Sequence, residues 1–193
     1  MALQVPVLFG SVRTERQGIK AARFVVNELK KYGCEPVLVD AKQYDLPLLD
    51  KMYKEYETGT APARLEELAK LYRAADGFAI VTGEYNHGVQ PGLKNLLDYF
   101  LEEYYWRPSA VISYSGGYFG GARAAVQVRE ILGELGMPAI SSVLPVPNVG
   151  SAFDDAGEPS DPKFRSRSED FFKEFVWYME ALRAQRAKGA VPY

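Results

Sequence analysis

Two kinds of hydrophobic pattern alternate along the chain. Short, almost wholly apolar runs such as Leu3–Gly10 and Gly77–Gly83 are typical of strands buried on both faces of a parallel sheet. Between such runs, apolar residues recur at every third or fourth position, as they do through Gly18–Tyr32, which predicts amphipathic helices. This order of strand, helix, strand and helix predicts an α/β fold with helices on both faces of a mostly parallel sheet.

The elements follow one another without a repeat, a low-complexity tract or a linker, so we expect a single domain over residues 1–193. The expected strands are Leu3–Gly10, Cys34–Asp40, Gly77–Gly83, Arg107–Ser115 and Met137–Val149. The expected helices are Gly18–Tyr32, one through Leu65, Leu68 and Tyr72, Gln90–Trp106, one through Ala122 and Leu135, and Ser168–Ala187.

Four segments do not fit the pattern simply. Pro6 is awkward in a central strand, because proline has no N–H to give to a neighbouring strand. Tyr53–Thr60 is either a lid over a ligand site or a solvated connector, and its polarity slightly favours the connector. Tyr104–Trp106 is either core or an exposed apolar patch that suits a partner. Residues 150–170 are expected to form a polar surface loop.

Composition excludes several classes of function. The formal net charge of −2 offers no electrostatic grip on nucleic acid. No apolar run reaches the ~18 residues of a membrane span and no signal peptide opens the chain, so a membrane is not expected as a partner either. The single cysteine and single histidine, Cys34 and His87, exclude an internal disulfide and a metal site with several such ligands. We therefore expect a cytoplasmic protein whose chemistry, if any, is carried by a bound cofactor.

Three unusual segments each follow a predicted strand: Gly10–Ile19, Thr82–Gly88 and Ser113–Gly121. The carboxyl ends of parallel strands lie at one edge of the sheet, where ligands of doubly wound folds bind. The first segment opens a helix, so its amides and the helix dipole suit a phosphate, with Arg13 and Arg16 adding positive charge. It contains neither common nucleotide-binding glycine motif, and a plain polar turn before the helix is an equally acceptable interpretation.

The second and third segments suit a flat ligand. Tyr85 and His87 offer planar faces and Asn86 offers hydrogen bonds, although a lone histidine is more often a surface or capping residue. The third segment, "SYSGGYFGG", has glycines that leave room for a planar ring, but a turn that only lets the next helix pack closely is about as plausible. The coincidence of three such segments at one edge favours a ligand site.

Together, "GSVR" after the first strand, "EYNHG" and "PGLKNLLDY" after the third, and "SYSGG" and "GGARA" after the fourth resemble the NAD(P)H-dependent FMN reductase family of flavodoxin-like proteins. The resemblance covers almost the whole chain in order, and the EYN segment is its most specific part. It implies a flavodoxin-like, doubly wound three-layer sandwich with a five-stranded parallel sheet in the order 2-1-3-4-5. It also implies non-covalently bound FMN that is reduced by NADPH or NADH.

The resemblance also implies which residues bind the cofactor. Those expected at the FMN phosphate are Ser11, Arg13, Gln17, Gly18 and Ile19. Those expected at the isoalloxazine ring are Glu84, Tyr85, Asn86, His87 and Gly88 on one side, with Ser115, Gly116 and Gly117 on the other. Two positions depart from the family pattern. The family often has serine at Gln17, which affects the phosphate pocket, and often proline at Gly83, which affects the freedom of the following loop.

The implied reaction needs positioning rather than side-chain acid–base chemistry, so no catalytic side chain and no metal are expected. We expect a ping-pong reductase in which NAD(P)H gives a hydride to flavin N5 and the two electrons then pass to a quinone, an azo compound, free flavin or a metal ion. Family members commonly form homodimers or homotetramers, and the helix after Pro91 and the segment Gly120–Arg129 are the expected contacts. The alternatives are a one-electron flavodoxin-type carrier, which the modest net charge disfavours, and a non-catalytic FMN-binding redox sensor.

Overall fold

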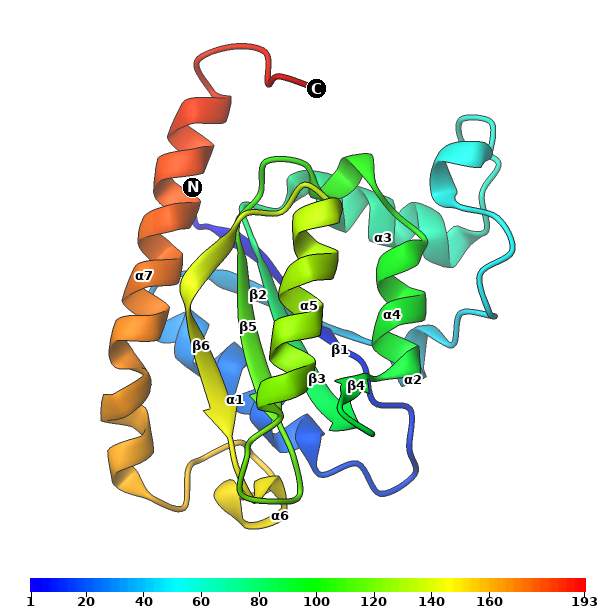
Figure 1. Ribbon diagram of the computed structural model, residues 1–193. Coiled ribbons are helices and arrows are strands. Elements are labelled where there is room, and N and C mark those ends of the chain that lie inside the picture. The colour runs from blue at the N-terminus through cyan, green and yellow to red at the C-terminus, as the bar shows by residue number, and fades with distance from the viewer.

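Five parallel strands form the sheet at the centre of the molecule, and the computed structural model describes all residues 1–193 (Figure 1). The strand order is β2-β1-β3-β5-β6, which is the predicted order 2-1-3-4-5 with the strands renumbered. The strands are β1 (Gln4–Phe9), β2 (Glu35–Asp40), β3 (Phe78–Tyr85), β5 (Ser109–Tyr114) and β6 (Ala139–Val146). The predicted flavodoxin-like sheet is confirmed.

One short strand was not predicted. The two-residue strand β4 (Gly88–Val89) turns back antiparallel against the end of β3, so that Glu84 pairs with Val89 and Tyr85 with Gly88. The pairing also shows why β1 tolerates Pro6. Its pairing with β3 begins only at Val7, after the proline that has no N–H to donate.

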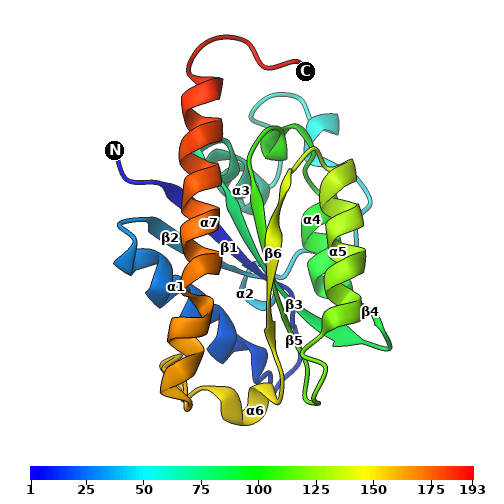
Figure 2. The same ribbon diagram turned by 60° about the vertical axis from the view of Figure 1, so that its left-hand side comes forward.

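Helices cover both faces of the sheet, as Figure 2 shows. On one face lie α1 (Gly18–Lys31) and α7 (Pro162–Arg186), and on the other lie α3 (Ala63–Ala74), α4 (Pro91–Asp98) and α5 (Ala122–Glu134). The remaining short helices are α2 (Ala41–Tyr44), η1 (Tyr53–Glu55), η2 (Glu102–Tyr104) and α6 (Val149–Ala152). No helix is long and apolar enough to cross a membrane.

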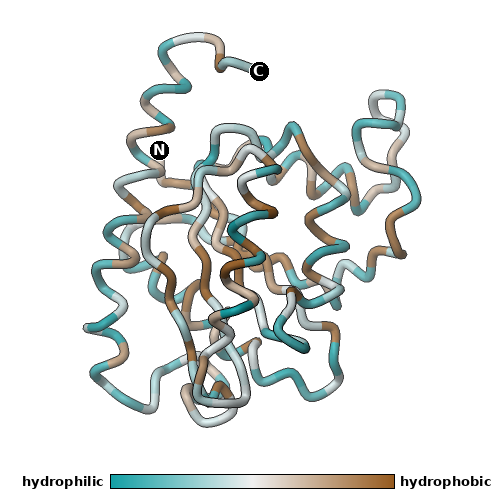
Figure 3. The backbone as a smooth tube through the Cα atoms, in the orientation of Figure 1, coloured by the Kyte–Doolittle hydropathy of each residue, from teal (hydrophilic) through white to brown (hydrophobic).

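Each face of the sheet has its own hydrophobic core. One core contains 24 buried residues and joins β1 to α1 and α7, whereas the other contains 22 and joins the opposite face to α3, α4 and α5. The apolar residues accordingly follow the central strands and the inner sides of the helices in Figure 3. This is the burial that the wholly apolar runs predicted for strands covered on both faces.

Two helices differ from the prediction. The helix expected over Gln90–Trp106 ends at Asp98, because Leu101 leaves the helical region with φ −145° and the chain continues in η2. Tyr104 is fully buried among Tyr72, Phe78 and Phe100, so it belongs to the core. The last helix begins six residues before the predicted Ser168, since Asp161 caps its first turn by accepting a hydrogen bond from the Lys163 amide.

One of the two edges of the sheet, strand β6, is blocked by side chains from both covering layers. The carboxylate of Glu174 in α7 accepts hydrogen bonds from the amides of Ser141 (2.9 Å) and Ser142 (3.3 Å). Arg129 of α5 donates to the carbonyl of Ser141 at 3.0 Å. Further along the strand, Pro145 has no N–H to offer.

Candidate functional site

A cavity of about 610 Å³ opens at the carboxyl ends of the strands, at the lower end of the molecule in Figure 1. Four segments enclose it: the β1–α1 loop, the end of β3, the turn after β5, and the segment after β6. Its lining residues are Ser11, Arg13, Glu15, Arg16, Gln17, Gly18, Glu84, Tyr85, Gln90, Tyr114, Ser115, Gly116, Asn148, Val149, Gly150 and Ser151. The three segments singled out in the sequence thus meet at one edge of the sheet.

The β1–α1 loop presents hydrogen-bond donors to this cavity. None of the backbone amides of residues 11–17 donates a hydrogen bond to another group of the chain, and α1 begins directly after them. Such a run of amides at a helix N-terminus is suited to an anion. The loop is held by Arg16, which forms an ion pair with the buried carboxylate of Asp40 and donates to the Ser11 carbonyl at 2.8 Å. Arg13 is exposed and forms no ion pair.

The residues of the β3–β4 hairpin have different surroundings: two form its exposed turn and one contacts helix α5. Asn86 and His87 form its two-residue turn with φ values of 49° and 67°, the positive values that such a tight hairpin turn requires. Both are exposed and neither lines the cavity. Glu84 points to the N-terminus of α5, where its carboxylate accepts hydrogen bonds from the amides of Arg123 (3.0 Å) and Ala124 (3.3 Å).

The electrostatics of Glu84 follow from that position. Burial raises the pKa of its carboxyl, but the two amides and the Arg123 guanidinium, 3.3 Å away, outweigh burial and leave the pKa below its ordinary value. A carboxylate at a helix N-terminus also interacts favourably with the helix dipole. Glu84 therefore connects the hairpin to α5 and fixes one wall of the cavity.

A polar network lies at the floor of the cavity. The Gln90 side chain is buried; its Nε2 donates to the Tyr114 hydroxyl at 3.0 Å, and its Oε1 accepts from the Gly83 amide at 2.9 Å. Above it, the hydroxyl groups of Ser11 and Tyr85 lie 3.4 Å apart. Burial raises the pKa of the Tyr114 phenol well above its ordinary value, so it is neutral at physiological pH. The network ties the ends of β3 and β5 together.

The turn after β5 forms an open rim. A Cβ added to Gly116 or Gly117 would meet nothing within 4 Å, so the backbone there leaves space beside the cavity. The amides of residues 116–121 donate no hydrogen bond within the chain, although Ser115 donates to the Gly117 carbonyl at 2.9 Å. Tyr118 and Phe119 follow with their rings exposed and edge-to-face, their centroids 5.9 Å apart.

Eight of the thirteen residues predicted for the site line the cavity. They are Ser11, Arg13, Gln17, Gly18, Glu84, Tyr85, Ser115 and Gly116. The other five lie beside it rather than in its wall, namely Ile19, Asn86, His87, Gly88 and Gly117. The contact of all thirteen with a cofactor stays a prediction. The segment Tyr53–Thr60, considered as a lid, does not line the cavity and is held to Tyr99, whose carbonyl accepts from the Tyr53 amide.

Sequence reasoning missed two parts of this site. Gln90 and Tyr114 belong to predicted elements, and nothing in their local pattern shows that their side chains meet under the cavity. The segment Asn148–Ser151 follows the fifth strand, whose carboxyl end lies at the same edge of the sheet as the others. That rule of topology was the available signal, but the sequence prediction assigned Asn148 and Val149 to the fifth strand itself and Gly150 and Ser151 to a polar surface loop.

The chain belongs to the NADPH-dependent FMN reductase family, which it matches over residues 3–150. It is 31% identical to a quinone reductase of Pseudomonas putida over 188 residues, which cover 93% of this chain and 96% of that protein. It is 36% identical to a quinone reductase of Escherichia coli over 136 residues, 67% of this chain and 69% of that protein. The predicted family and the predicted class, an oxidoreductase enzyme, are confirmed.

Solved structures agree on the fold. FerB, a flavoenzyme NAD(P)H:(acceptor) oxidoreductase from Paracoccus denitrificans, aligns with a TM-score of 0.72 at 22% identity, covering 92% of this chain and 97% of FerB. A flavodoxin from Pseudomonas aeruginosa aligns with a TM-score of 0.56 at 22% identity, covering 91% and 98%. Both support the flavodoxin-like fold.

The cavity itself fits FMN, the cofactor of the family. Its unpaired loop amides at the start of α1 are donors for a phosphate, and the open backbone at Gly116 and Gly117 leaves room for a planar ring system. The walls between these two places are mainly polar, as a ribityl chain with several hydroxyl groups requires. The two ends of the cavity therefore match the two unlike ends of the cofactor.

Proposed function

We propose that this protein is a ping-pong reductase that takes a hydride from NADPH or NADH and passes the two electrons to a quinone, an azo compound, free flavin or a metal ion. Bound FMN supplies the two-electron chemistry, accepting the hydride from the nucleotide and passing the two electrons on. The observation that carries the proposal is the polar cavity at the carboxyl ends of the strands, with unpaired amides at one end and open glycine backbone at the other.

The residues of the chain bind and orient rather than exchange protons. The amides of residues 11–17, together with Arg13, Gln17 and Gly18, hold the phosphate end. Tyr85 borders one side of the ring and Ser115–Gly117 the other, and the hairpin with Asn86 and His87 stands at the outer edge. The exposed rings of Tyr118 and Phe119 are at the rim, where a planar substrate can stack. No side chain has to act as an acid or a base for hydride transfer between stacked rings.

The test is an absorbance spectrum of the purified protein after FMN has been added and the excess removed, followed by anaerobic NADPH. Retained flavin that bleaches with NADPH or NADH supports the proposal. Absence of retained flavin contradicts it, because the cavity would then hold something else. Steady-state kinetics with a quinone should give parallel double-reciprocal lines, whereas intersecting lines would exclude the ping-pong order.

The alternative of an electron carrier or redox sensor makes a different prediction in the same experiment. A carrier or sensor would retain FMN that stays oxidised with either nucleotide. The curated relatives are named as reductases, which favours the enzyme. The location in the cytoplasm, predicted from the single cysteine, remains part of the proposal.

We also propose a homodimer or homotetramer that uses α5. Val126 is exposed on this helix beside an apolar groove of about 640 Å³ between α5 and β6, and the aromatic rings of Tyr118 and Phe119 extend the same side. The helix after Pro91 is the second proposed contact. Sedimentation velocity should give a species of at least twice the 21.6 kDa chain mass, and the variant Val126→Asp should weaken the assembly. A monodisperse monomer would contradict the proposal.

A further inference from the structure

The fourth wall of the cavity is the segment Asn148–Ser151, which joins β6 to the last helix. On its inner side it is tied to the turn after β5, because the Asn148 amide donates to the Gly117 carbonyl and the Val149 amide to the Ser115 carbonyl, both at 3.0 Å. These two bonds fix only one end of the segment. The contacts that hold the other end of the segment lie outside the cavity.

The chain that follows forms a closed turn over residues 153–160. The carboxylate of Asp154 accepts from the amides of Ala156 (2.9 Å) and Glu158 (2.8 Å), and the Asp154 amide donates back to the Glu158 carbonyl at 2.9 Å. Gly157 has φ 89°, and a Cβ there would lie 2.5 Å from the amide nitrogen of Phe24. The turn therefore lies directly on the backbone of α1.

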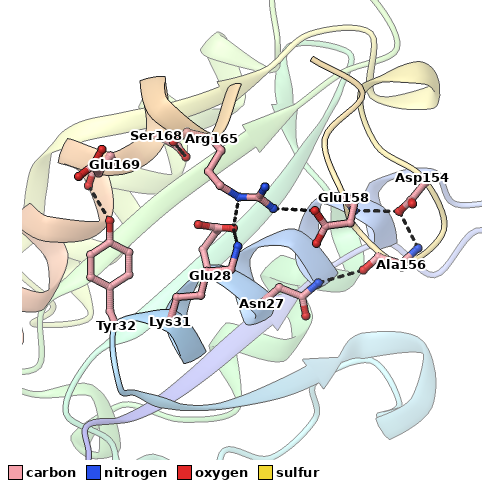
Figure 4. Close-up of polar contacts among 10 residues, drawn as sticks. All are labelled: Asn27, Glu28, Lys31, Tyr32, Asp154, Ala156, Glu158, Arg165, Ser168 and Glu169. Atoms are coloured by element: carbon pink, nitrogen blue, oxygen red, sulfur yellow. Dashed lines mark hydrogen bonds and ion pairs between the residues drawn. The ribbon is translucent and has the colours of Figure 1, made fainter. Parts of the chain in front are cut away.

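Side chains of α1 and α7 clasp this turn from both sides, as Figure 4 shows. Asn27 of α1 donates to the Ala156 carbonyl at 3.0 Å. Arg165 of α7 binds two carboxylates at once, donating through Nε to Glu28 of α1 (2.8 Å) and through Nη2 to Glu158 of the turn (2.7 Å). Arg165 thus joins α1, α7 and the turn through hydrogen bonds, beside the packing of Phe164 on Phe24 and Phe153.

We propose that Arg165 is a positioning residue of the cofactor site, which holds the Asn148–Ser151 segment against α1 by binding Glu28 and Glu158 together. This inference rests on the proposed function in that the cavity is taken to bind FMN. The beginning of α1 offers the anion-binding amides, so a segment kept close to α1 closes the cavity beside its phosphate end. Loss of the Arg165 contacts loosens that wall, which Asn27 and Ser160 still hold in part, without removing any group that touches the cofactor.

The variant Arg165→Ala should still fold. Glu28 is 4% exposed, but it keeps a second counter-ion, because Lys31 Nζ lies 2.7 Å from the same oxygen. No buried carboxylate is therefore left unpaired. A matched control lies two residues further along the helix: Arg167 binds only Asp161, at 2.7 Å, and makes no contact with the turn.

The first measurement is amide hydrogen exchange of the flavin-free protein. Arg165→Ala should speed exchange in residues 148–160 while leaving the central strands unchanged, and Arg167→Ala should change neither. The second measurement is FMN affinity by quenching of flavin fluorescence. Arg165→Ala should weaken it about tenfold, the effect of losing one charge-assisted hydrogen bond, and Arg165→Lys should recover part of the loss.

Three outcomes would overturn the inference. Unchanged exchange in residues 148–160 would mean that Arg165 does not hold the segment. Faster exchange with unchanged FMN affinity would mean that the segment does not shape the site. Faster exchange throughout the protein would give Arg165 a general structural role. If the unmodified protein binds no FMN, the proposed function fails, whereas the exchange of the flavin-free protein still decides whether Arg165 holds the segment.

Discussion

The phenol ring of Tyr114 lies against the Cα of Gly18, so closely that a Cβ on Gly18 would be 2.1 Å from Cζ of the ring. The last residue of β5 thereby meets the first residue of α1 beneath the cavity. A side chain at position 18 and an aromatic ring at position 114 exclude each other. Glycine at the first position of α1 is therefore needed for this close approach.

Gly18→Ala should weaken FMN binding at least tenfold, because the added methyl group displaces the Tyr114 ring from the cavity floor. Titration of the apoprotein with FMN measures the effect. In the double variant Gly18→Ala/Tyr114→Ala the two losses should not add, since the steric conflict is gone. Gly133→Ala in α5 is the control: nothing lies within 4 Å of that position, and alanine should stabilise the helix by about 0.5–1 kcal/mol. Additive losses in the double variant would contradict the argument.

Tyr114→Phe should destabilise the fold by about 1 kcal/mol, because the buried Gln90 amide loses its acceptor. Denaturant unfolding monitored by circular dichroism measures the free energy of unfolding. Tyr118→Phe removes a hydroxyl from a ring that is 83% exposed and should leave stability unchanged. Equal effects of the two variants would show that the Gln90 contact contributes nothing.

Glu84→Gln should lower stability at neutral pH by about 1 kcal/mol, since an amide oxygen is a weaker partner for the α5 amides and Arg123. The pKa of Glu84 is lowered in the folded protein, so its stabilisation is complete above the ordinary value of 4.5 and is lost as the pH falls from there through the folded pKa. Wild type and variant should therefore converge in acid. Thermal unfolding over this pH range tests it, with the exposed Glu130→Gln as control. A difference that persists undiminished in acid would contradict it.

Cys34 should resist thiol reagents in the native protein. Burial, followed by the charges of Asp76 and Glu180, raises the pKa of its thiol to about 11, so very little thiolate is present near pH 8. Reaction with a chromogenic disulfide should be at least a hundredfold slower than in the denatured chain. Each unit by which the pKa of the thiol rises lowers the fraction of thiolate about tenfold. Rapid native reaction would show that the site opens readily.

Much of the fold was predictable because its signals are local. Apolar runs flanked by helical spacing predict five parallel strands, and the rule that ligands bind at the carboxyl ends of the strands places Ser11, Tyr85 and Ser115 at one edge, where the cavity lies. The residues at which helices begin and end were harder to predict than the helices themselves. The helix after Pro91 continues in apolar spacing past Asp98, but the backbone leaves the helical region at Leu101 and Tyr104 packs against Tyr72. The start of α7 could have been predicted, because Asp161 is a typical N-cap residue and Pro162 is typical of the first position of a helix.

The parts of the site that were missed depend on contacts between distant residues. The bond between Gln90 and Tyr114 spans 24 positions, and the ion pair between Glu28 and Arg165 spans 137. Neither separation leaves a pattern in a single sequence. Asn86 and His87, predicted beside a flat ligand, also form a hairpin turn that asparagine tolerates well, and their contact with a ligand stays a prediction.

Strand β6 lies at one edge of the sheet and offers few free backbone groups with which another strand could pair. Because Glu174 takes the amides of Ser141 and Ser142, Arg129 takes a carbonyl, and Pro145 has no donor, an approaching extended chain finds few hydrogen-bonding groups to pair with. This edge of the sheet is thereby protected from pairing with a strand of another chain.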